Sequence, residues 1–309
     1  MKHLLLPVIT PILTVVAAIM LFWYAACVPM NIKFALMTAE RAGEQVTPMG
    51  MQEQRLTPVA LLVAKNPAQW ADTWVQDKPR LPAPHQIVAE LWKSTMEVKP
   101  TSKRSLVFHG WITLSATLLG FVIGSGLGIL LAVGIVHSRA MDMSVMPWAI
   151  ASQTIPILAI APMIIVVLNS IGLQGLIPKA IISAYLSFFP VVVGMVKGLR
   201  SPSPMDLDLV KTWSATKAQA FWKLRLPASA PYLFASLKIG VASSLVGTIV
   251  GELPSGTGQG LGFRLLSGSY YGQTVQIWSA LFATAILAAC LVAIIGLLER
   301  GVLKRMGLS

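Results

Sequence analysis

Long apolar runs alternate with short polar segments along the chain. Six runs meet or approach the roughly 20 apolar residues that a helix needs to cross a hydrocarbon core of about 30 Å. They lie near residues 4–28, 111–136, 147–171, 176–196, 230–252 and 277–298. Pro156 and Pro162 interrupt the third run, which neighbouring helices can accommodate inside a membrane. The pattern predicts an all-α polytopic membrane protein with about six transmembrane helices.

The composition supports this class. Only 12% of the 309 residues are charged and 55% are hydrophobic, whereas a soluble domain is roughly a quarter charged. The first run follows Lys2 as a signal peptide would, and Ala25-Ala26-Cys27 has some likeness to a lipoprotein cleavage site. However, the run exceeds the usual apolar length of about 7–15 residues, and Tyr24 is a poor residue before such a site. We therefore expect a retained first helix.

The basic residues indicate the orientation. Six spans place both termini on one side, and the two short loops on the other side carry only Lys179 and Arg264. By the positive-inside rule the termini are cytoplasmic, which predicts a multi-pass membrane protein with both ends inside the cell. The net charge of +12 then reflects orientation, and no nucleic-acid partner is indicated. The cytoplasmic basic residues are Lys2, Arg139, Lys197, Arg200, Lys211, Lys217, Lys223, Arg225, Arg300, Lys304 and Arg305.

The same reasoning divides the chain into four parts. Residues 1–28 form the first helix, residues 29–108 an extended external loop, residues 109–300 the transmembrane core, and residues 301–309 a cytoplasmic tail. Within the external loop we expect a short amphipathic helix near 85–97 and irregular or helical pieces from Pro58 to Trp74.

The sequence predicts no metal site, no cofactor and no catalytic site. Cys27 and Cys290 lie in separate apolar runs, and no histidine is spaced with a second ligand. His3, His85, His109 and His137 are therefore interpreted as surface or interfacial residues. The chain contains no G-x-x-x-x-G-K-[ST] sequence, so any ATP-driven role requires a separate ATPase.

Glycines recur in two places with different meanings. Gly120, Gly124 and Gly128 repeat at a spacing of four inside an apolar run, which predicts a helix face for close helix packing. A second cluster, which includes Gly258, Gly260 and Gly262, follows the fifth run on the external side. This loop is either an external gate at the mouth of a translocation path or a simple connector.

The cytoplasmic segment 197–229 combines helix-forming residues with aromatic and basic side chains. Pro202, Pro204 and two acidic residues predict a helix start, and Leu226-Pro227 predicts its end. Exposed Trp213, Phe221 and Trp222 need a covering surface. Either the segment is an interfacial anchor or it is a docking helix for a partner protein.

Two charges lie inside or at the end of the fifth run. Lys238 is about 12 Å into the span by helix rise from Pro231, near enough to the cytoplasmic face to snorkel, and we favour this over a role in the path. Glu252 ends the span on the external side, where it either orients the glycine loop or marks the membrane interface.

Several motifs resemble a known family. The segment 208–227 resembles the E-A-A-x-x-x-G-A-S…Q-x-F…L-P loop of permease subunits of binding-protein-dependent ABC importers, and in particular of the nitrate, sulfonate and taurine branch. The residues aligned with this motif are Asp208-Leu209-Val210, Ser214-Ala215, Gln219, Phe221 and Leu226-Pro227. Asp208 replaces the family's Glu, Leu209 and Val210 replace its two alanines, and Ser214 replaces its glycine.

The likeness extends over roughly residues 81–300. Leu81-Pro82-Ala83-Pro84 resembles the family's segment before the second span, and His109 to Gly128 resembles its H-x-x-x-T-L-x-x-x-L-x-G-F-x-x-G-x-x-x-G stretch. Glu252 with Gly258 to Phe263 resembles its acidic residue and G-x-G-L-G element. Residues 29–80 match no part of the family that we recognise.

The resemblance implies a type I importer permease fold and a set of partners. The implied partners are two ABC ATPase subunits, a periplasmic substrate-binding protein and membrane lipid. A second copy of the permease is also implied, so that the permease forms a homodimer. Loop 206–227 would couple to the ATPase through Asp208, Ser214, Ala215, Gln219, Phe221, Leu226 and Pro227. The solute would be small and polar or anionic, and its identity is not encoded in these motifs.

Two other function classes compete with this interpretation. A secondary transporter or channel-like protein would work without an ATPase, but such proteins use ionisable residues at the bilayer midplane, and no such pair is present in the sequence. A membrane-anchored enzyme would need clustered His, Cys or carboxylate residues in the external loop, where carboxylates are only dispersed.

Overall fold

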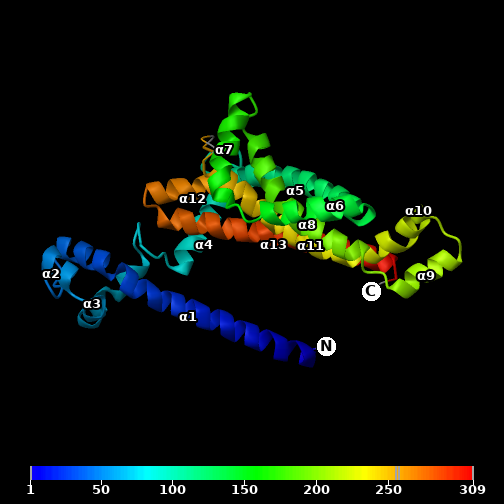
Figure 1. The fold of residues 1–309 in the computed structure, drawn as a ribbon. Helices are drawn as coiled ribbons and strands as arrows, with labels where there is room; N and C mark the ends of the chain where they lie inside the picture. The colour runs from blue at the N-terminus through cyan, green and yellow to red at the C-terminus, as the bar shows by residue number, and fades with distance from the viewer. Residues whose placement is uncertain (1, 255, 257, 308–309) are drawn as a thin grey trace. The chain divides into compact units, whose positions relative to one another are not determined.

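The computed structural model describes residues 2–254, 256 and 258–307, with side chains from residue 10 onward, and every regular element in these residues is helical. The helices form two compact units. The first unit contains the chain up to Lys99 together with Leu265–Leu281, and the second contains Pro100–Arg264 and the chain from Phe282 onward. Helices α12 (Leu261–Tyr270) and α13 (Thr274–Arg305) contribute to both units (Figure 1).

The first unit is built on α1 (Lys2–Arg41), which continues well beyond the predicted apolar run. It also contains α2 (Met51–Leu56), α3 (Val59–Lys65), a 3-10 helix (Pro67–Trp74), α4 (Pro84–Trp92) and a π-helical turn (Lys93–Glu97). The last two elements occupy the range predicted for a short amphipathic helix.

The extension of α1 is stabilised by its own small core. Ile32, Leu36 and Ala39 are buried against Val46 and Leu62 from the segment that folds back on the helix. Buried Asn31 holds the chain beyond α3, because its side-chain amide donates to the carbonyls of Thr73 and Leu81 at 2.9 and 2.8 Å. These contacts explain why α1 does not end where the apolar run ends.

The second unit packs three long helices together. These are α5 (Leu106–His137), α8 (Leu176–Leu199) and α11 (Leu226–Glu252), and α8 packs extensively against both of the others. The buried core at one end contains Ala132 and Ile135 of α5 with Val192, Met195 and Leu199 of α8. Between α8 and α11 follow the short helices α9 (Pro204–Thr212) and α10 (Lys217–Ala220) and a π-helical turn (Phe221–Arg225).

Gly120, Gly124 and Gly128 lie on the face of α5 that meets α8. A Cβ atom at Gly124 would be 2.7 Å from the Ala184 carbonyl oxygen, and one at Gly128 would be 2.8 Å from the Phe188 carbonyl oxygen. At Gly120 a Cβ would overlap the Ser183 side chain. The missing side chains therefore let the two helix backbones approach closely.

Serine and threonine hydroxyls link the same three helices. The Ser183 hydroxyl of α8 lies 2.9 Å from the Ser244 carbonyl oxygen of α11, and the Thr117 hydroxyl of α5 donates to Thr248 at 3.0 Å. The Ser244 hydroxyl donates to the Thr117 carbonyl at 2.9 Å. Such bonds replace water as hydrogen-bond partners inside a membrane protein.

The region predicted as one span over 147–171 is broken. Helix α6 (Arg139–Ser152) and helix α7 (Ile157–Ser170) meet at 97°, and Pro156 caps the start of α7. Within the described residues, five helices are long and apolar enough to cross a membrane, or six if this bent pair is one span. The expected third span is therefore bent in the structure, because Pro156 lacks the amide hydrogen that a continuous helix would use.

Candidate functional sites

Glu252 lies at the end of α11 and is fully buried. Its carboxylate accepts a hydrogen bond from the Gly262 amide at 2.8 Å and from the Thr113 hydroxyl at 2.8 and 3.0 Å to its two oxygens. Glu252 therefore holds the glycine loop against α5. Of the two roles expected for it, the structure places it in the first, since a marker of the membrane surface would be exposed.

Thr113 connects the carboxylate to the loop a second time. Its hydroxyl donates to Glu252 and also accepts a hydrogen bond from the Leu261 amide at 2.9 Å. Both functions of one hydroxyl are thus used, and Thr113 itself is completely buried.

His109 binds the same loop one helical turn away on α5. The Gly260 amide donates to His109 Nδ1 at 3.0 Å, so the proton of the neutral ring lies on Nε2, which donates to the Lys103 carbonyl at 2.9 Å. His109 is only 1% exposed. The interpretation of this histidine as a surface residue was wrong, because its spacing of four from Thr113 places both side chains on one helix face.

Lys179 supplies a positive charge to this cluster. It is 2% exposed in the first turns of α8, its ammonium donates to the Gln259 carbonyl at 3.2 Å, and its charge attracts the Glu252 carboxylate. The prediction that Lys179 belongs to a short external loop is wrong, because the residue lies within α8. A buried charge needs such partners, since an isolated one would carry a large desolvation cost.

The loop glycines fit this close attachment. Gly260 has φ of +112°, and a Cβ there would overlap the Glu252 carboxylate. At Gly262 a Cβ would lie 2.6 Å from the Ile249 carbonyl oxygen. Gly258 has φ of +66° and lies near the Phe263 ring. Only glycine combines these backbone angles with such proximity.

We call His109, Thr113, Lys179, Glu252 and residues 258–262 the loop latch. Its members come from α5, α8 and α11 and from the loop itself. The hydrogen bonds that join His109, Thr113 and Glu252 to the loop are buried, so opening the loop requires several of them to break together. Sequence analysis found Glu252 and the glycines but missed Thr113 and Lys179.

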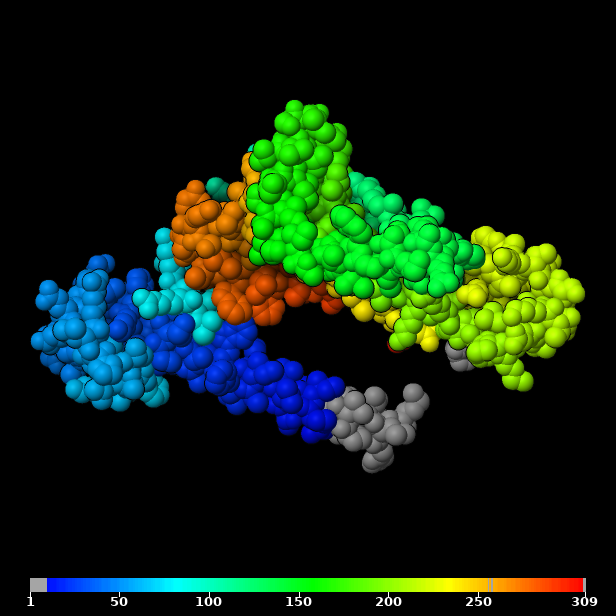
Figure 2. Space-filling model, in the orientation of Figure 1, coloured from blue at the N-terminus to red at the C-terminus, as the bar shows by residue number. Residues whose placement is uncertain are grey.

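The second site is the projecting segment 204–225, which we call the coupling segment. Figure 2 shows it in yellow-green as a lobe at the end of the second unit. None of the residues of α9 or α10 is buried. Both helices nevertheless have complete start signals, because Ser203 pairs with Asp206 and Thr216 pairs with Gln219 in reciprocal capping boxes.

Ser214 forms the bend between these helices. Its φ is +55°, and it is the one non-glycine residue in the described part of the chain with a positive φ. Its amide donates to the Lys211 carbonyl at 2.8 Å, and the Ala215 amide donates to the Val210 carbonyl at 3.3 Å. These bonds form a helix end with a left-handed residue, a position that favours glycine. Ser214 therefore adopts a backbone conformation that glycine would adopt without strain.

Two of the expected coupling residues face the transmembrane core. Phe221 packs edge-on against His137 of α5, with ring centroids 5.1 Å apart, and Leu226 joins the buried core of α5 and α8. The Arg225 guanidinium donates to the Leu199 carbonyl at 3.2 Å. The segment is thereby fixed to the ends of α5 and α8.

Pro227 does not end a helix, contrary to our expectation. It lies in the first turn of α11, which follows the π-helical turn without interruption. Proline is tolerated there because the first amides of a helix have no partner within it. The coupling segment is therefore continuous with α11, which ends at Glu252.

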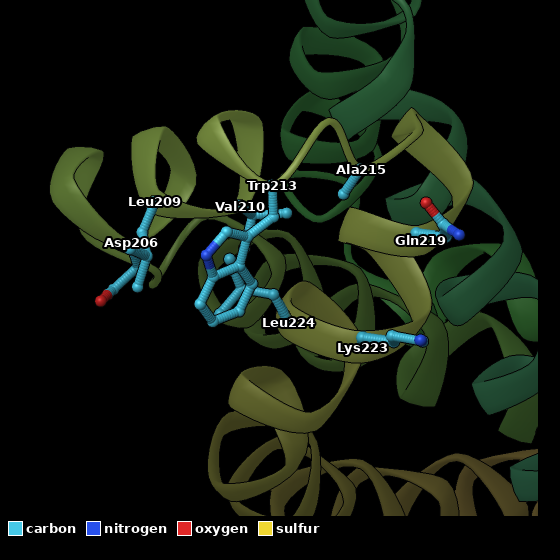
Figure 3. A pocket seen from close by; sticks show the side chains of 8 residues that line it. All are labelled: Asp206, Leu209, Val210, Trp213, Ala215, Gln219, Lys223 and Leu224. Atoms are coloured by element: carbon cyan, nitrogen blue, oxygen red, sulfur yellow. The ribbon is translucent and has the colours of Figure 1, made fainter.

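A groove of about 470 Å³ lies between α9 and the turn that follows α10. Figure 3 shows the Trp213 indole beside Val210 and Leu224, with the Asp206 carboxylate and the Lys223 ammonium pointing away from them. Leu209, Ala215 and Gln219 complete the lining. Asp208 is exposed and pairs with Lys211 at 2.8 Å.

Lys238 of α11 reaches a carboxylate on α13. Its ammonium forms an ion pair with Glu299 of α13, and both side chains are partly buried. The pair connects α11 to the C-terminal half of α13. Glu299 directly follows the sixth predicted run, 277–298, and the sequence pattern did not bring it together with Lys238.

Comparison with known proteins now identifies the family. The family described as "Binding-protein-dependent transport system inner membrane component" matches residues 124–307, which contain the coupling segment and the glycine loop. The chain belongs to this family. It is the permease subunit of an ABC importer and an inner-membrane protein, and the family works with an ATPase and a substrate-binding protein.

Individual permeases match over most of their length. The formylaminopyrimidine transport permease ThiX of Halalkalibacterium halodurans is 32% identical over 59% of this chain and 68% of its own. The riboflavin permease RibX of Chloroflexus aurantiacus is 29% identical over 71% and 78% of the two chains. The nitrate import permease NrtB of Synechocystis is 26% identical over 71% and 76%.

Proposed function

We propose that this permease subunit carries a small polar or anionic solute across the inner membrane and receives the driving motion through the coupling segment. Relatives whose names specify formylaminopyrimidine, nitrate and aliphatic sulfonates support this solute class. The chain contributes no ATPase chemistry of its own, in line with the missing phosphate-binding loop. A second copy completes the path, and membrane lipid covers the apolar helix faces.

The single observation that carries the coupling role is the backbone at Ser214. An exposed bend with φ of +55° is maintained between two capped helices that bury none of their own residues. Strained conformations persist where the surrounding structure and a function require them. Together with the exposed Trp213 and the groove beside it, the bend forms a rigid apolar surface suited to an ATPase subunit.

The loop latch is the proposed external gate. It is attached to α11, the same helix whose first turn continues from the coupling segment. A shift of α11 would therefore alter both ends together, which is the physical requirement for alternating access. In this proposal the path is closed on the external side when all hydrogen bonds of the loop latch are formed. The gate residues are Glu252, Gly258, Gly260 and Gly262.

A pair of substitutions tests the coupling role. In the purified complex with its ATPase, reconstituted in lipid, Ser214→Trp is expected to abolish stimulation of ATP hydrolysis by the binding protein, because a bulky side chain on this exposed bend would obstruct the surface proposed to contact the ATPase. Ser214→Gly keeps the bend and is expected to retain stimulation. Normal stimulation in Ser214→Trp, at normal assembly, would contradict the proposal.

A further inference from the structure

The first unit has an apolar helix face that its described residues leave uncovered. Val88, Trp92 and Met96 are 63%, 62% and 68% exposed. Their spacing of four places them on one face of α4 and the turn that follows it. A different face of the same helix is already packed, since Ile87 and Ser94 are buried. The exposed apolar face is therefore additional to the helix's own core contacts.

A groove beside this face continues onto α1. The groove has a volume of about 630 Å³ and is lined by Met20, Tyr24, His85, Val88, Ala89 and Trp92 among others. Met20 belongs to the apolar run of α1, where Leu21 and Phe22 are 73% and 76% exposed. The apolar face of α4 is thus continuous with the membrane-facing surface of a transmembrane helix.

Aromatic side chains gather at the same level of α1. Trp23 lies 4.9 Å from Trp278 between ring centroids, and Tyr24 lies 5.9 Å from both Trp74 and His85. Trp and Tyr are enriched where a membrane meets water. Twenty residues back from Tyr24, at 1.5 Å per residue, span about 30 Å, which is one hydrocarbon thickness. Tyr24 therefore marks the membrane surface.

Helix α4 is fixed at this level by direct bonds. The Tyr24 hydroxyl and His85 Nδ1 are 3.0 Å apart, and the Trp23 indole donates to the Pro82 carbonyl at 3.0 Å. The charged side chains Glu90 and Lys93 lie on α4 and the turn after it, away from the Val88 and Met96 positions. A helix at the surface with separate apolar and charged faces has the pattern of an interfacial helix.

We propose that α4 lies in the membrane interface, with Val88, Trp92 and Met96 inserted among lipid acyl chains. The occupant of the groove is then a membrane lipid, and Glu90 and Lys93 face water. The proposal deepens the lipid contact included in the proposed function, but it rests on α4 and not on the coupling segment. Its failure would therefore leave the Ser214 experiment unaffected.

Site-directed spin labelling of the full complex tests the position of α4. Cys27→Ser and Cys290→Ala provide a background without other cysteines, and single cysteines replace Val88, Trp92 or Met96. The matched controls are Glu90→Cys and Lys93→Cys on the same elements. The complex is reconstituted in nanodiscs of phosphatidylethanolamine and phosphatidylglycerol, and relaxation by oxygen and by a nickel chelate is measured.

We expect labels at 88, 92 and 96 to collide with oxygen and to be protected from the nickel chelate, and the two control labels to show the reverse. Thermal unfolding of each variant identifies labels that disturb the fold, and those positions are excluded from the comparison. Equal nickel access at all positions would overturn the proposal. Protection that develops only when binding protein is added would also overturn it and would assign the face to that protein.

Discussion

Thr113 has the most demanding position in the loop latch, because one hydroxyl serves both the Glu252 carboxylate and the Leu261 amide. Thr113→Val keeps the shape of the side chain but leaves both partners without this bond. Burying unsatisfied polar groups costs about 1–3 kcal/mol. We therefore expect a lower thermal unfolding temperature for the reconstituted complex.

Thr113→Ser is the control for this substitution, since it retains the hydroxyl and removes one methyl group. It should remain close to the wild type, and the difference between the two variants isolates the hydrogen bonds. If Val and Ser lower the unfolding temperature equally, the hydroxyl has no special role in holding the loop.

A second prediction at the residue scale concerns the contribution of the Lys238–Glu299 ion pair to stability. Lys238→Met and Glu299→Gln each leave a partly buried charge without its partner, so each should lower the unfolding temperature. The double variant leaves neither charge. Its loss of unfolding free energy should therefore be smaller than the sum of the losses in the two single variants. A coupling energy of about 1 kcal/mol is expected from the double-mutant cycle in thermal unfolding; strict additivity would show that the pair is not formed.

The sequence predicted individual functional residues only where local patterns contain them. The glycines of the loop and Glu252 stand out because they interrupt or end an apolar run. Lys179 and Thr113 do not, since their partners lie 80 and 139 residues away in the chain. The i, i+4 spacing of His109 and Thr113 was the available signal, because it places two polar groups on one face of an apolar helix.

At the scale of elements, the glycine face of α5 decides how closely α8 approaches. Gly124→Ala would place a methyl group against the Ala184 carbonyl and the Ser187 hydroxyl. Because two backbones would have to separate, we expect a loss of about 1–3 kcal/mol. Thermal unfolding in detergent measures this loss.

Gly126 offers a matched control in the same helix. A Cβ at Gly126 would meet nothing within 4 Å, so Gly126→Ala should be neutral or should stabilise the helix by up to about 1 kcal/mol through its higher helix propensity. Equal destabilisation by the two alanines would mean that general helix effects, and not the contact with α8, determine the result.

Hydropathy predicted α5, α8, α11 and α13 because each of these helices is dominated by a continuous apolar run. It could not predict the extension of α1, since Ile32, Leu36 and Ala39 are buried by a local core that forms only when residues 46–62 fold back. Nor could it predict the 97° break, because the apolar composition on either side of Pro156 is the same whether the helix continues or turns. An apolar composition indicates that a segment lies in the membrane, but it does not indicate in which direction the helix runs there.

For the whole molecule, the bent pair α6 and α7 determines the topology. If the pair crosses the membrane, the termini lie on the same side, and the basic coupling segment shares that side with them. If it does not cross, the coupling segment with Lys211, Lys217 and Lys223 lies opposite the N-terminus. The positive-inside rule favours crossing, because only then do these basic residues and Lys2 lie together.

Cysteine labelling in intact cells distinguishes the two topologies. In the background without native cysteines, Ala140→Cys in the first turn of α6 and Gln174→Cys after α7 replace exposed residues at the two ends of the pair, and Met205→Cys marks the coupling segment. With crossing, a membrane-impermeant maleimide should label position 174 in intact cells and positions 140 and 205 only after permeabilisation. If 140 and 174 instead react alike, the bent pair returns to the side from which it started, and the termini lie on opposite sides of the membrane.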